Sequence, residues 1–220
     1  MIRLILVLFA VVAFLILSIP ILIVEWLIDK KNPKFRDESS LHIVQFMFRL
    51  IQWLAGTKVT VIGEENVPKD IPVLYIGNHR SFFDIVITYA RCPRLTGYVA
   101  KDSMKKVPLL SVWMERLYCL FLNRTDIKEG LKTILTGIEQ IKNGISMCIF
   151  PEGTRNKGDD ETKLLPFKEG SFKMAEKTGC PIILMSMNNT SAILEDHFPF
   201  IRSTHVVLEY SKPIYPKELS

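Results

Sequence analysis

A short buried strand that ends in a polar turn constrains the fold of this chain more than any other feature. Residues 72–84 begin with an apolar run that stops at Gly77. The polar tetrad Asn78-His79-Arg80-Ser81 follows, and two aromatic residues then lead to Asp84. This pattern predicts a strand, a turn and the start of a helix. Open α/β sheets place their functional sites at such strand-to-helix turns.

Strand patterns and helix patterns alternate along the rest of the chain, which predicts an α/β layered fold. We expect a mixed, largely parallel sheet flanked by helices, and no internal repeat is present. The expected strands are residues 58–62, 73–76, 96–100, 119–122, 146–150, 181–187 and 205–210, and the expected helices are 81–89, 107–116, 128–142 and 167–178.

The N-terminal region carries much of the apolar excess. Leu4–Val24 is an apolar run long enough to cross roughly 30 Å of hydrocarbon as a helix, and Pro20 could kink it. Residues 25–31 form a polar border with an aromatic anchor. A polar linker, residues 32–40, separates this run from a second helical pattern at residues 41–54, which Ser39 or Ser40 could cap.

Three interpretations of this region remain open. It is a transmembrane helix followed by a core helix, or a two-helix hairpin that dips into one leaflet, or two helices that pack on the body. Basic residues crowd residues 30–36, whereas Arg3 alone precedes the run, so either membrane interpretation places the remainder on the cytoplasmic side. We therefore expect hydrophobic membrane-anchoring helices over residues 1–56 and an α/β catalytic domain over residues 57–220.

The net charge is +5, which favours anionic partners such as a membrane surface or a phosphate-bearing ligand. No block of basic residues interleaved with aromatics occurs, so a nucleic-acid partner is not expected. Cys92, Cys119, Cys148 and Cys180 are scattered, and no pair has the spacing of metal ligands. We expect them to be reduced and buried, and we expect no metal site.

His79 and Asp84 are the first candidates for chemistry. Five helical residues turn about 500°, so the two side chains meet only if His79 lies on the turn and Asp84 in the first helical turn. Asp84 would then fix the histidine tautomer and leave the other ring nitrogen free as a base for a substrate hydroxyl. The alternative is structural, because Ser81 and Asp84 also fit a capping box.

Residues 150–155, Phe-Pro-Glu-Gly-Thr-Arg, follow another buried strand. Gly153 permits close approach of a ligand, Arg155 offers a planar fork suited to phosphate, and Glu152 can accept from a ligand hydroxyl or hold a basic neighbour. The alternative is an ordinary turn with a surface ion pair. Arg124 and Lys101 also follow strands, so the four segments should converge on one crevice, although Lys101 alone fits a solvated face.

Taken together, these segments resemble the glycerolipid acyltransferases. Residues 78–84 resemble the His-x-x-x-x-Asp motif of that family, and residues 150–155 resemble its Phe-Pro-Glu-Gly-Thr-Arg motif. Residues 122–124, 165–170 and 180–182 resemble three further segments, in the same order, although Cys180 stands where the family usually has an aliphatic residue. The resemblance spans residues 58–215 and is strongest to 1-acylglycerol-3-phosphate acyltransferases.

The resemblance implies a mechanism without cofactor, metal or acyl-enzyme. His79, oriented by Asp84, would deprotonate lysophosphatidic acid, which attacks the thioester of acyl-CoA or acyl-carrier protein to give phosphatidic acid. A backbone N–H near Gly153 would stabilise the oxyanion. The resemblance assigns the phosphate and glycerol to Arg124, Glu152, Gly153, Thr154, Arg155 and Lys101, and counts Asn78, Arg80, Ser81, Pro151 and Pro181 among the other motif positions.

Two other functions stay open. One is a sibling enzyme that acylates glycerol-3-phosphate or a lysophospholipid with a larger head group. The other is a membrane protein that binds anionic lipid without chemistry. Thiol release from an acyl thioester in the presence of an acceptor separates the enzymes from the binding protein.

Overall fold

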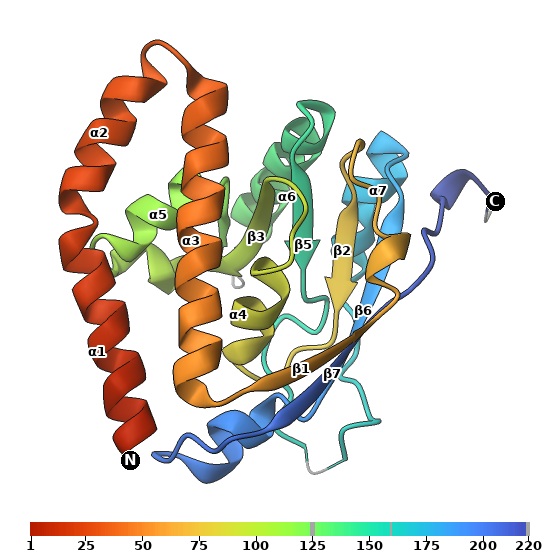
Figure 1. Cartoon of the computed structure of the whole chain (residues 1–220). Helices are drawn as coiled ribbons and strands as arrows, with labels where there is room; N and C mark the ends of the chain where they lie inside the picture. The colour runs from red at the N-terminus through yellow and green to blue at the C-terminus, as the bar shows by residue number, and fades with distance from the viewer. Residues whose placement is uncertain (124–125, 159, 219–220) are drawn as a thin grey trace.

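The strands form one seven-stranded sheet, which is described here from a computed structural model covering residues 1–123, 126–158 and 160–218 (Figure 1). The order across the sheet is β1-β7-β6-β2-β5-β3-β4. Each strand lies within one residue of its predicted range. The strands are β1 (Lys58–Ile62), β2 (Leu74–Gly77), β3 (Thr96–Lys101), β4 (Leu120–Leu122), β5 (Ser146–Ile149), β6 (Ile182–Asn188) and β7 (His205–Tyr210).

The sheet is mixed and largely parallel, as predicted. Strands β6, β2, β5, β3 and β4 run parallel, and β7 pairs antiparallel with β6 and parallel with β1. The carboxyl ends of the five parallel strands therefore meet at one edge. Strand β2 lies inside this set and is buried on both faces, as expected for a strand covered by helices on both sides.

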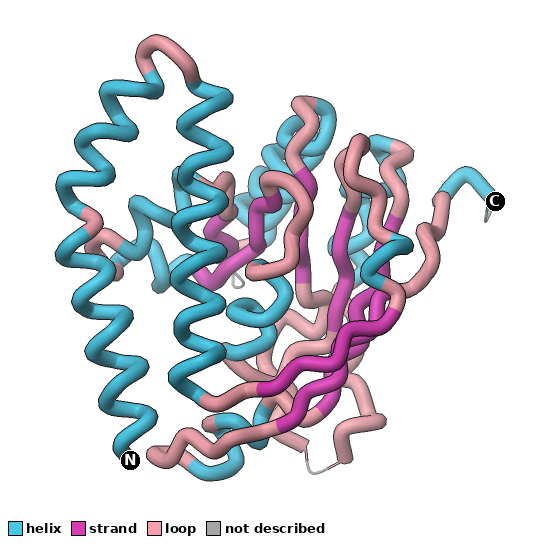
Figure 2. The backbone as a smooth tube through the Cα atoms, viewed as in Figure 1, coloured by secondary structure: helices cyan, strands magenta, loops and turns pink. Residues whose placement is uncertain are grey.

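Helices cover the two faces unequally. The N-terminal helices and α4 (Phe83–Tyr89) pack over one face, where Tyr75 of β2 joins a cluster with Ile87, and α5 (Leu110–Arg116) belongs to the same layer. Helices α6 (Ile127–Lys142) and α7 (Lys173–Thr178) cover the other face, where Ile76 packs with Met174. Figure 2 shows the sheet between these layers.

Three N-terminal helices form the outer part of the first layer: α1 (Ile2–Leu17), α2 (Ile19–Asp29) and α3 (Pro33–Ala55). Helices α1 and α2 meet at a 46° bend beside Ser18. Among the described residues, no single helix has both the length and the apolar character for a membrane crossing, but this bent pair has them together. The expected kink near Pro20 is thus present, and Pro20 occupies the first turn of α2.

The predicted linker at residues 32–40 is wrong, because these residues are helical. Helix α3 begins at Pro33, and its cap is Asn32, whose side chain accepts from Phe35 N at 3.1 Å, rather than Ser39 or Ser40. Proline is well tolerated at the first helical position. The polar residues that suggested a linker are paired instead, as in the Arg36–Asp29 contact of 3.2 Å.

Glu25 also departs from its expected place in an interfacial border. Its side chain is only 2% exposed, accepts a hydrogen bond from Ser40 Oγ, and lies 3.6 Å from Arg116 Nη1 of α5. A second polar contact of α5 reaches the bend, where Trp113 Nε1 donates to Ser18 Oγ at 2.9 Å. The α1–α2 pair is therefore fixed to the body by buried polar contacts, which must be satisfied because an unpaired buried charge is costly.

The predicted helix at residues 167–178 is also shorter than expected. A 3₁₀ turn occupies Glu169–Phe172, and the α-helix begins only at Lys173. Gly170 stands inside the 3₁₀ turn, and glycine weakens an α-helix interior.

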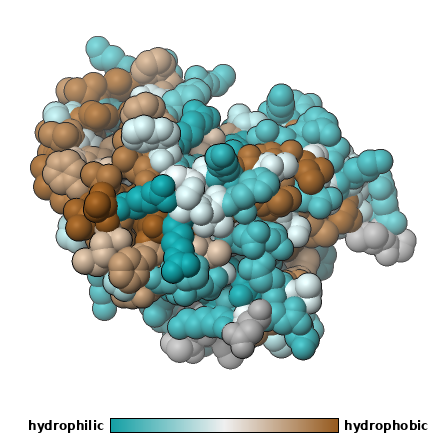
Figure 3. Space-filling view, turned by 60° about the horizontal axis from the view of Figure 1, so that its bottom comes forward, coloured by the Kyte–Doolittle hydropathy of each residue, from teal (hydrophilic) through white to brown (hydrophobic). Residues whose placement is uncertain are grey.

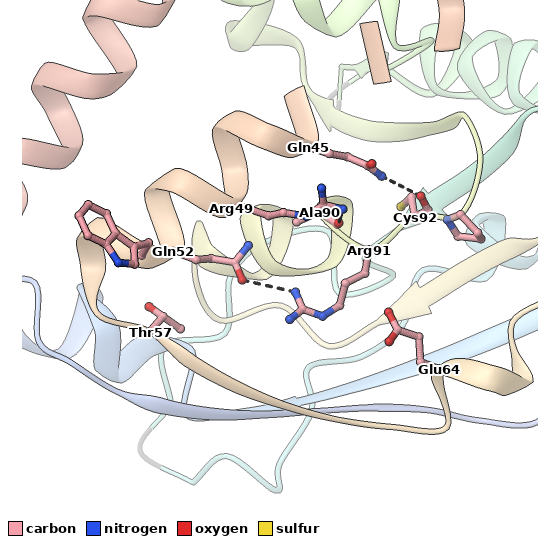
Figure 4. Close-up of a pocket in the computed structure, with 10 residues that line it drawn as sticks. Gln45, Arg49, Gln52, Thr57, Glu64, Ala90, Arg91 and Cys92 are labelled. Atoms are coloured by element: carbon pink, nitrogen blue, oxygen red, sulfur yellow. Dashed lines mark hydrogen bonds between the residues drawn. The ribbon is translucent and has the colours of Figure 1, made fainter. Parts of the chain in front are cut away.

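Side chains of α3 hold the carboxyl end of α4 (Figure 4). Gln45 Nε2 donates to Cys92 O at 2.8 Å, and Gln52 Nε2 donates to Val86 O at 3.1 Å. Arg49 Nη2 donates to Ala90 O at 3.0 Å. A helix leaves its last carbonyl groups without intrahelical partners. Gln52 bonds one of the last carbonyls of α4, and Gln45 and Arg49 bond the segment that follows the helix. These three side chains of α3 also line a cavity of about 620 Å³. Their hydrogen bonds position α4 against α3.

Candidate active site

The turn between β2 and α4 carries the predicted histidine and aspartate. Asn78 anchors the turn to the next strand, because its amide donates to Met187 O and accepts from Met187 N, each at 2.8 Å. On the other side of the turn, Asn156 N donates to His79 O at 2.7 Å. The turn is therefore held by both neighbouring segments, through Asn78 on one side and through the carbonyl of His79 on the other.

His79 and Asp84 meet as their spacing predicts. His79 Nδ1 donates to Asp84 Oδ2 at 2.8 Å, and Asp84 is 1% exposed. The ring of His79 stacks on Phe150, with centroids 4.3 Å apart and an interplanar angle of 15°. The imidazole is thus fixed by a carboxylate at one edge and by an aromatic ring on one face. Its Nε2 can serve as the acceptor for a substrate proton.

Asp84 also fulfils the structural alternative. Its Oδ2 accepts from Arg80 N at 2.7 Å and from Ser81 N at 2.8 Å, while Ser81 Oγ accepts from Phe83 N at 3.0 Å. The bonds between Ser81 and Asp84 resemble those of a capping box, although the helix itself begins at Phe83. One carboxylate oxygen therefore both shapes the turn and contacts the imidazole.

Glu152 is buried, and its contacts differ from those expected. Its Oε1 accepts from His79 N at 2.8 Å, its Oε2 accepts from Leu165 N at 2.9 Å, and the residue is only 4% exposed. Both oxygens therefore hold backbone. These contacts show that Glu152 supports the His79 turn, and its role in placing the glycerol of a substrate stays a prediction from the sequence.

Replacement of Glu152 by glutamine tests this assignment. An amide presents one acceptor and one donor, so one of the two N–H groups loses its partner. We expect the free energy of unfolding to fall by about 1–3 kcal/mol, measured by chemical denaturation. Glu139→Gln, at an exposed position of α6, is the matched control and should change it little. An unchanged stability of Glu152→Gln would show that the carboxylate does not hold these segments.

Gly153 is required by the turn that follows Glu152. Its φ is +70°, a conformation that favours glycine. Its N–H donates to Phe150 O at 3.0 Å within the turn. The N–H of Gly153 itself therefore already has a partner, and an oxyanion donor from a backbone N–H near Gly153 stays a prediction. Thr154 is exposed beside it, and Pro151 O accepts from Lys168 N at 2.8 Å.

Arg155 follows the Glu152 turn and forms an ion pair with Glu195, a partner that the sequence did not indicate. Its Nη1 donates to Glu195 Oε1 at 3.0 Å, and its guanidinium carbon lies 3.9 Å from the ring centroid of Phe82. Glu195 belongs to a 3₁₀ turn, Glu195–His197, between β6 and β7. It carries no recognisable motif, so only the tertiary structure reveals it.

A cavity of about 600 Å³ adjoins this turn. Cationic, acidic and apolar side chains line the same space, and the cationic and apolar ones suit a ligand with an anionic group and a hydrocarbon chain. Arg80 is 8% exposed there, and its Nη2 donates to Gly158 O at 2.7 Å. The charged lining residues are Arg80, Arg155, Lys157, Glu161, Glu195 and Asp196, and the apolar ones are Phe82, Leu194 and Phe198.

The remaining predicted site residues add little to the described geometry of the site. Arg124 lies outside the described residues. Lys101 is exposed at the end of β3, and no hydrogen bond or ion pair joins it to the other described site residues. Pro181 is buried and starts the pairing of β6 with β2, since its carbonyl accepts from Leu74 N at 3.0 Å.

The four cysteines are free thiols; Cys92, Cys148 and Cys180 are buried as expected, whereas Cys119 is half-buried. Burial raises the pKa of Cys92 to about 11 and holds the pKa of Cys148 well above its usual value. Burial likewise raises the pKa of Cys119 and Cys180. These thiols therefore stay protonated near neutral pH, whereas a nucleophilic cysteine reacts as the thiolate.

Comparison with known proteins identifies the class. The model of the acyltransferase family matches residues 58–188, which include β1, the His79 turn, the Glu152 turn and β6. The chain therefore belongs to the acyltransferase family. Glu195 lies beyond the matched segment.

Individual relatives carry a more specific name. A 1-acyl-sn-glycerol-3-phosphate acyltransferase of Borreliella burgdorferi is 37% identical over 69% of this chain, and one of Saccharomyces cerevisiae is 31% identical over 81%. The chain spans 60% of the length of each of these relatives. The crystal structure of the 1-acyl-sn-glycerophosphate acyltransferase PlsC from Thermotoga maritima matches with a TM-score of 0.82 over 98% of this chain and 86% of that chain; at 22% identity, this likeness shows the fold.

Proposed function

We propose that this protein transfers an acyl group from an acyl thioester to the sn-2 hydroxyl of 1-acylglycerol-3-phosphate, which yields phosphatidic acid for phospholipid synthesis. The observation that carries the proposal is the contact between His79 Nδ1 and Asp84 Oδ2 at 2.8 Å, beside a cavity lined by both cationic and apolar side chains. The names of the relatives agree with this substrate.

His79 acts as the general base in this proposal. Its Nε2 takes the proton of the acceptor hydroxyl while the oxygen attacks the thioester carbonyl. The tetrahedral intermediate then expels the thiolate, which recovers the proton from the imidazolium. Asp84 keeps Nδ1 protonated and stabilises the imidazolium, as a buried carboxylate does in related acid–base pairs. No covalent intermediate on the protein is needed.

The acceptor phosphate is assigned to the basic side chains at the carboxyl edge of the sheet. Arg155 is the best placed of those predicted, because its fork lies at the cavity and suits phosphate oxygens. Arg80 lines the same cavity, and Arg124 and Lys101 remain predictions from the sequence. The apolar lining residues Phe82, Leu194 and Phe198 suit the acyl chain of a lysolipid.

A crossed panel of donors and acceptors tests this proposal. Purified protein in lipid vesicles is given acyl-CoA or acyl-carrier protein as donor, since neither donor is favoured by the structure. Each donor is combined with 1-acylglycerol-3-phosphate, glycerol-3-phosphate or lysophosphatidylcholine. We expect thiol release and phosphatidic acid only with the first acceptor. Preference for glycerol-3-phosphate would reverse the choice of substrate. If no pair released thiol, the enzyme proposal would fail and the alternative of a lipid-binding protein would be favoured.

Membrane association is proposed for the α1–α2 pair, with the catalytic domain on the cytoplasmic side. Apolar side chains gather on one side of the molecule (Figure 3). A surface of this extent marks an interaction with lipid or protein, and the charge of +5 favours an anionic bilayer. Exposed members of this surface are Ile2, Ile5, Leu6, Leu8, Phe9, Val12, Ile16, Leu17, Ile19, Ile21, Ile23, Val24, Trp26 and Leu27.

A charge on this surface should release the protein from vesicles. Phe9 is 71% exposed, so Phe9→Asp should lower the fraction that sediments with anionic vesicles at least several-fold, because a carboxylate opposes insertion into the interface. Its thermal stability should stay unchanged. Leu131→Asp, 60% exposed on α6, is the matched control and should bind like the unaltered protein. Equal loss in both variants would argue against a lipid surface at α1–α2.

A further inference from the structure

One carboxylate outside the matched family segment joins the two motif-bearing turns. Glu195 Oε2 accepts from Ser81 Oγ at 2.7 Å, and its Oε1 accepts from Phe82 N at 2.9 Å and from Arg155 Nη1 at 3.0 Å. The first two donors belong to the turn between His79 and Asp84. The third belongs to the turn that follows β5. Glu195 therefore bonds both turns through one side chain, in addition to the contact of Glu152 with His79 N.

These contacts fix the guanidinium of Arg155 rather than merely neutralise it. Glu195 holds one Nη atom, and the ring of Phe82 lies against the guanidinium face at 3.9 Å. An arginine constrained at one edge and on one face still presents its other N–H groups to a ligand. A planar fork binds phosphate best when it is already oriented, because less rotamer entropy is then lost on binding.

We propose that Glu195 is a positioning residue for the acceptor phosphate, acting through Arg155. This inference rests on the proposed function and deepens it, since it names the group that selects a phosphate-bearing acceptor. Glu195 is 22% exposed and Arg155 is 30% exposed, so the pair is partly desolvated and accessible to a ligand from the cavity. We expect the larger effect on acceptor binding, because both Glu195 and Arg155 line the cavity.

A double-mutant cycle tests the inference. Glu195→Gln keeps an acceptor oxygen but loses the charge that holds Arg155, and we expect the KM for 1-acylglycerol-3-phosphate to rise roughly tenfold. The KM for the acyl donor should be unchanged, and kcat should fall much less. Arg155→Ala should also raise the acceptor KM. The double variant should be no worse than Arg155→Ala alone, because coupled residues are non-additive.

The controls separate this role from a structural one. Glu176→Gln removes an exposed carboxylate on α7 that accepts from Lys173 Nζ at 2.9 Å and does not line the cavity, so it should leave the acceptor KM unchanged. Chemical denaturation of every variant reports any loss of folding. Effects of Glu195→Gln and Arg155→Ala that multiply in the double variant would overturn the inference, as would an unchanged acceptor KM in Glu195→Gln.

The same cycle is measured by acceptor binding to protein in vesicles without a donor. This arm makes the two proposals separable. If the unaltered protein binds 1-acylglycerol-3-phosphate but transfers no acyl group, the proposed function fails and the binding cycle still decides the role of Glu195. If it transfers to 1-acylglycerol-3-phosphate while the cycle is additive, only the role of Glu195 fails. If the unaltered protein does not bind this lipid, both fail.

Discussion

Replacement of His79 by alanine is expected to lower acyl transfer by about 10²- to 10⁴-fold, the range that a positioned general base contributes. The fold should persist, because the contacts that hold the turn use the backbone N–H and carbonyl of His79, which alanine retains. Binding of the lysolipid should persist as well, since the phosphate is assigned to Arg155. The measurement is product formation by purified protein in vesicles, with lysolipid binding measured in parallel.

The matched control is His205→Ala. His205 is exposed on β7, where its Nε2 lies 2.8 Å from Thr60 Oγ1, and it has no place in the proposed mechanism. Its variant should transfer acyl groups at the unaltered rate. A near-normal rate in the His79→Ala variant would refute the role of His79 as the base.

Asp84→Asn should have an effect of similar size for a different reason. The asparagine oxygen can still accept from Arg80 N and Ser81 N, so much of the turn is kept. The negative charge that supports an imidazolium is lost, and the tautomer of His79 is no longer enforced. We expect the rate to fall on the order of 10³-fold, while the free energy of unfolding falls by about 1–3 kcal/mol.

The same substitution at a simple helix cap provides the comparison. Asp126 caps α6, and its Oδ1 accepts from Lys128 N at 2.8 Å and from Glu129 N at 3.1 Å. Asp126→Asn should retain the cap and the activity, since asparagine caps helices about as well as aspartate. If Asp84→Asn also folded normally and kept full activity, Asp84 would be a cap and nothing more.

Local patterns predicted the sheet and the His79–Asp84 contact. Each strand was bounded by residues that favour turns. His79 and Asp84 are five residues apart, so the geometry of one turn decides whether the two side chains meet. The order of the strands was not predictable in this way. It depends on which apolar faces pack together, as where Tyr75 and Ile76 of β2 enter different clusters.

Tertiary partners explain what the sequence did not reveal. Arg36 and Asp37 suggested a linker, but they form an ion pair at 3.0 Å within one continuous helix. Glu152 suggested a ligand contact, yet its two oxygens accept from backbone N–H groups. Glu195 lies more than a hundred residues from Ser81 along the chain, and no local spacing connects them. In each case the sequence showed a charged residue but did not show which group that residue contacts.

The central claim is direct transfer from thioester to hydroxyl, with His79 as the base and no acyl group on the protein. Mass spectrometry of the intact protein after mixing with an acyl thioester, with and without 1-acylglycerol-3-phosphate, tests it most directly. We predict an unchanged protein mass in both samples, with thiol and phosphatidic acid formed in equal amounts only when the acceptor is present. A protein mass raised by one acyl group in the sample without acceptor, and restored when the acceptor is added, would contradict the claim.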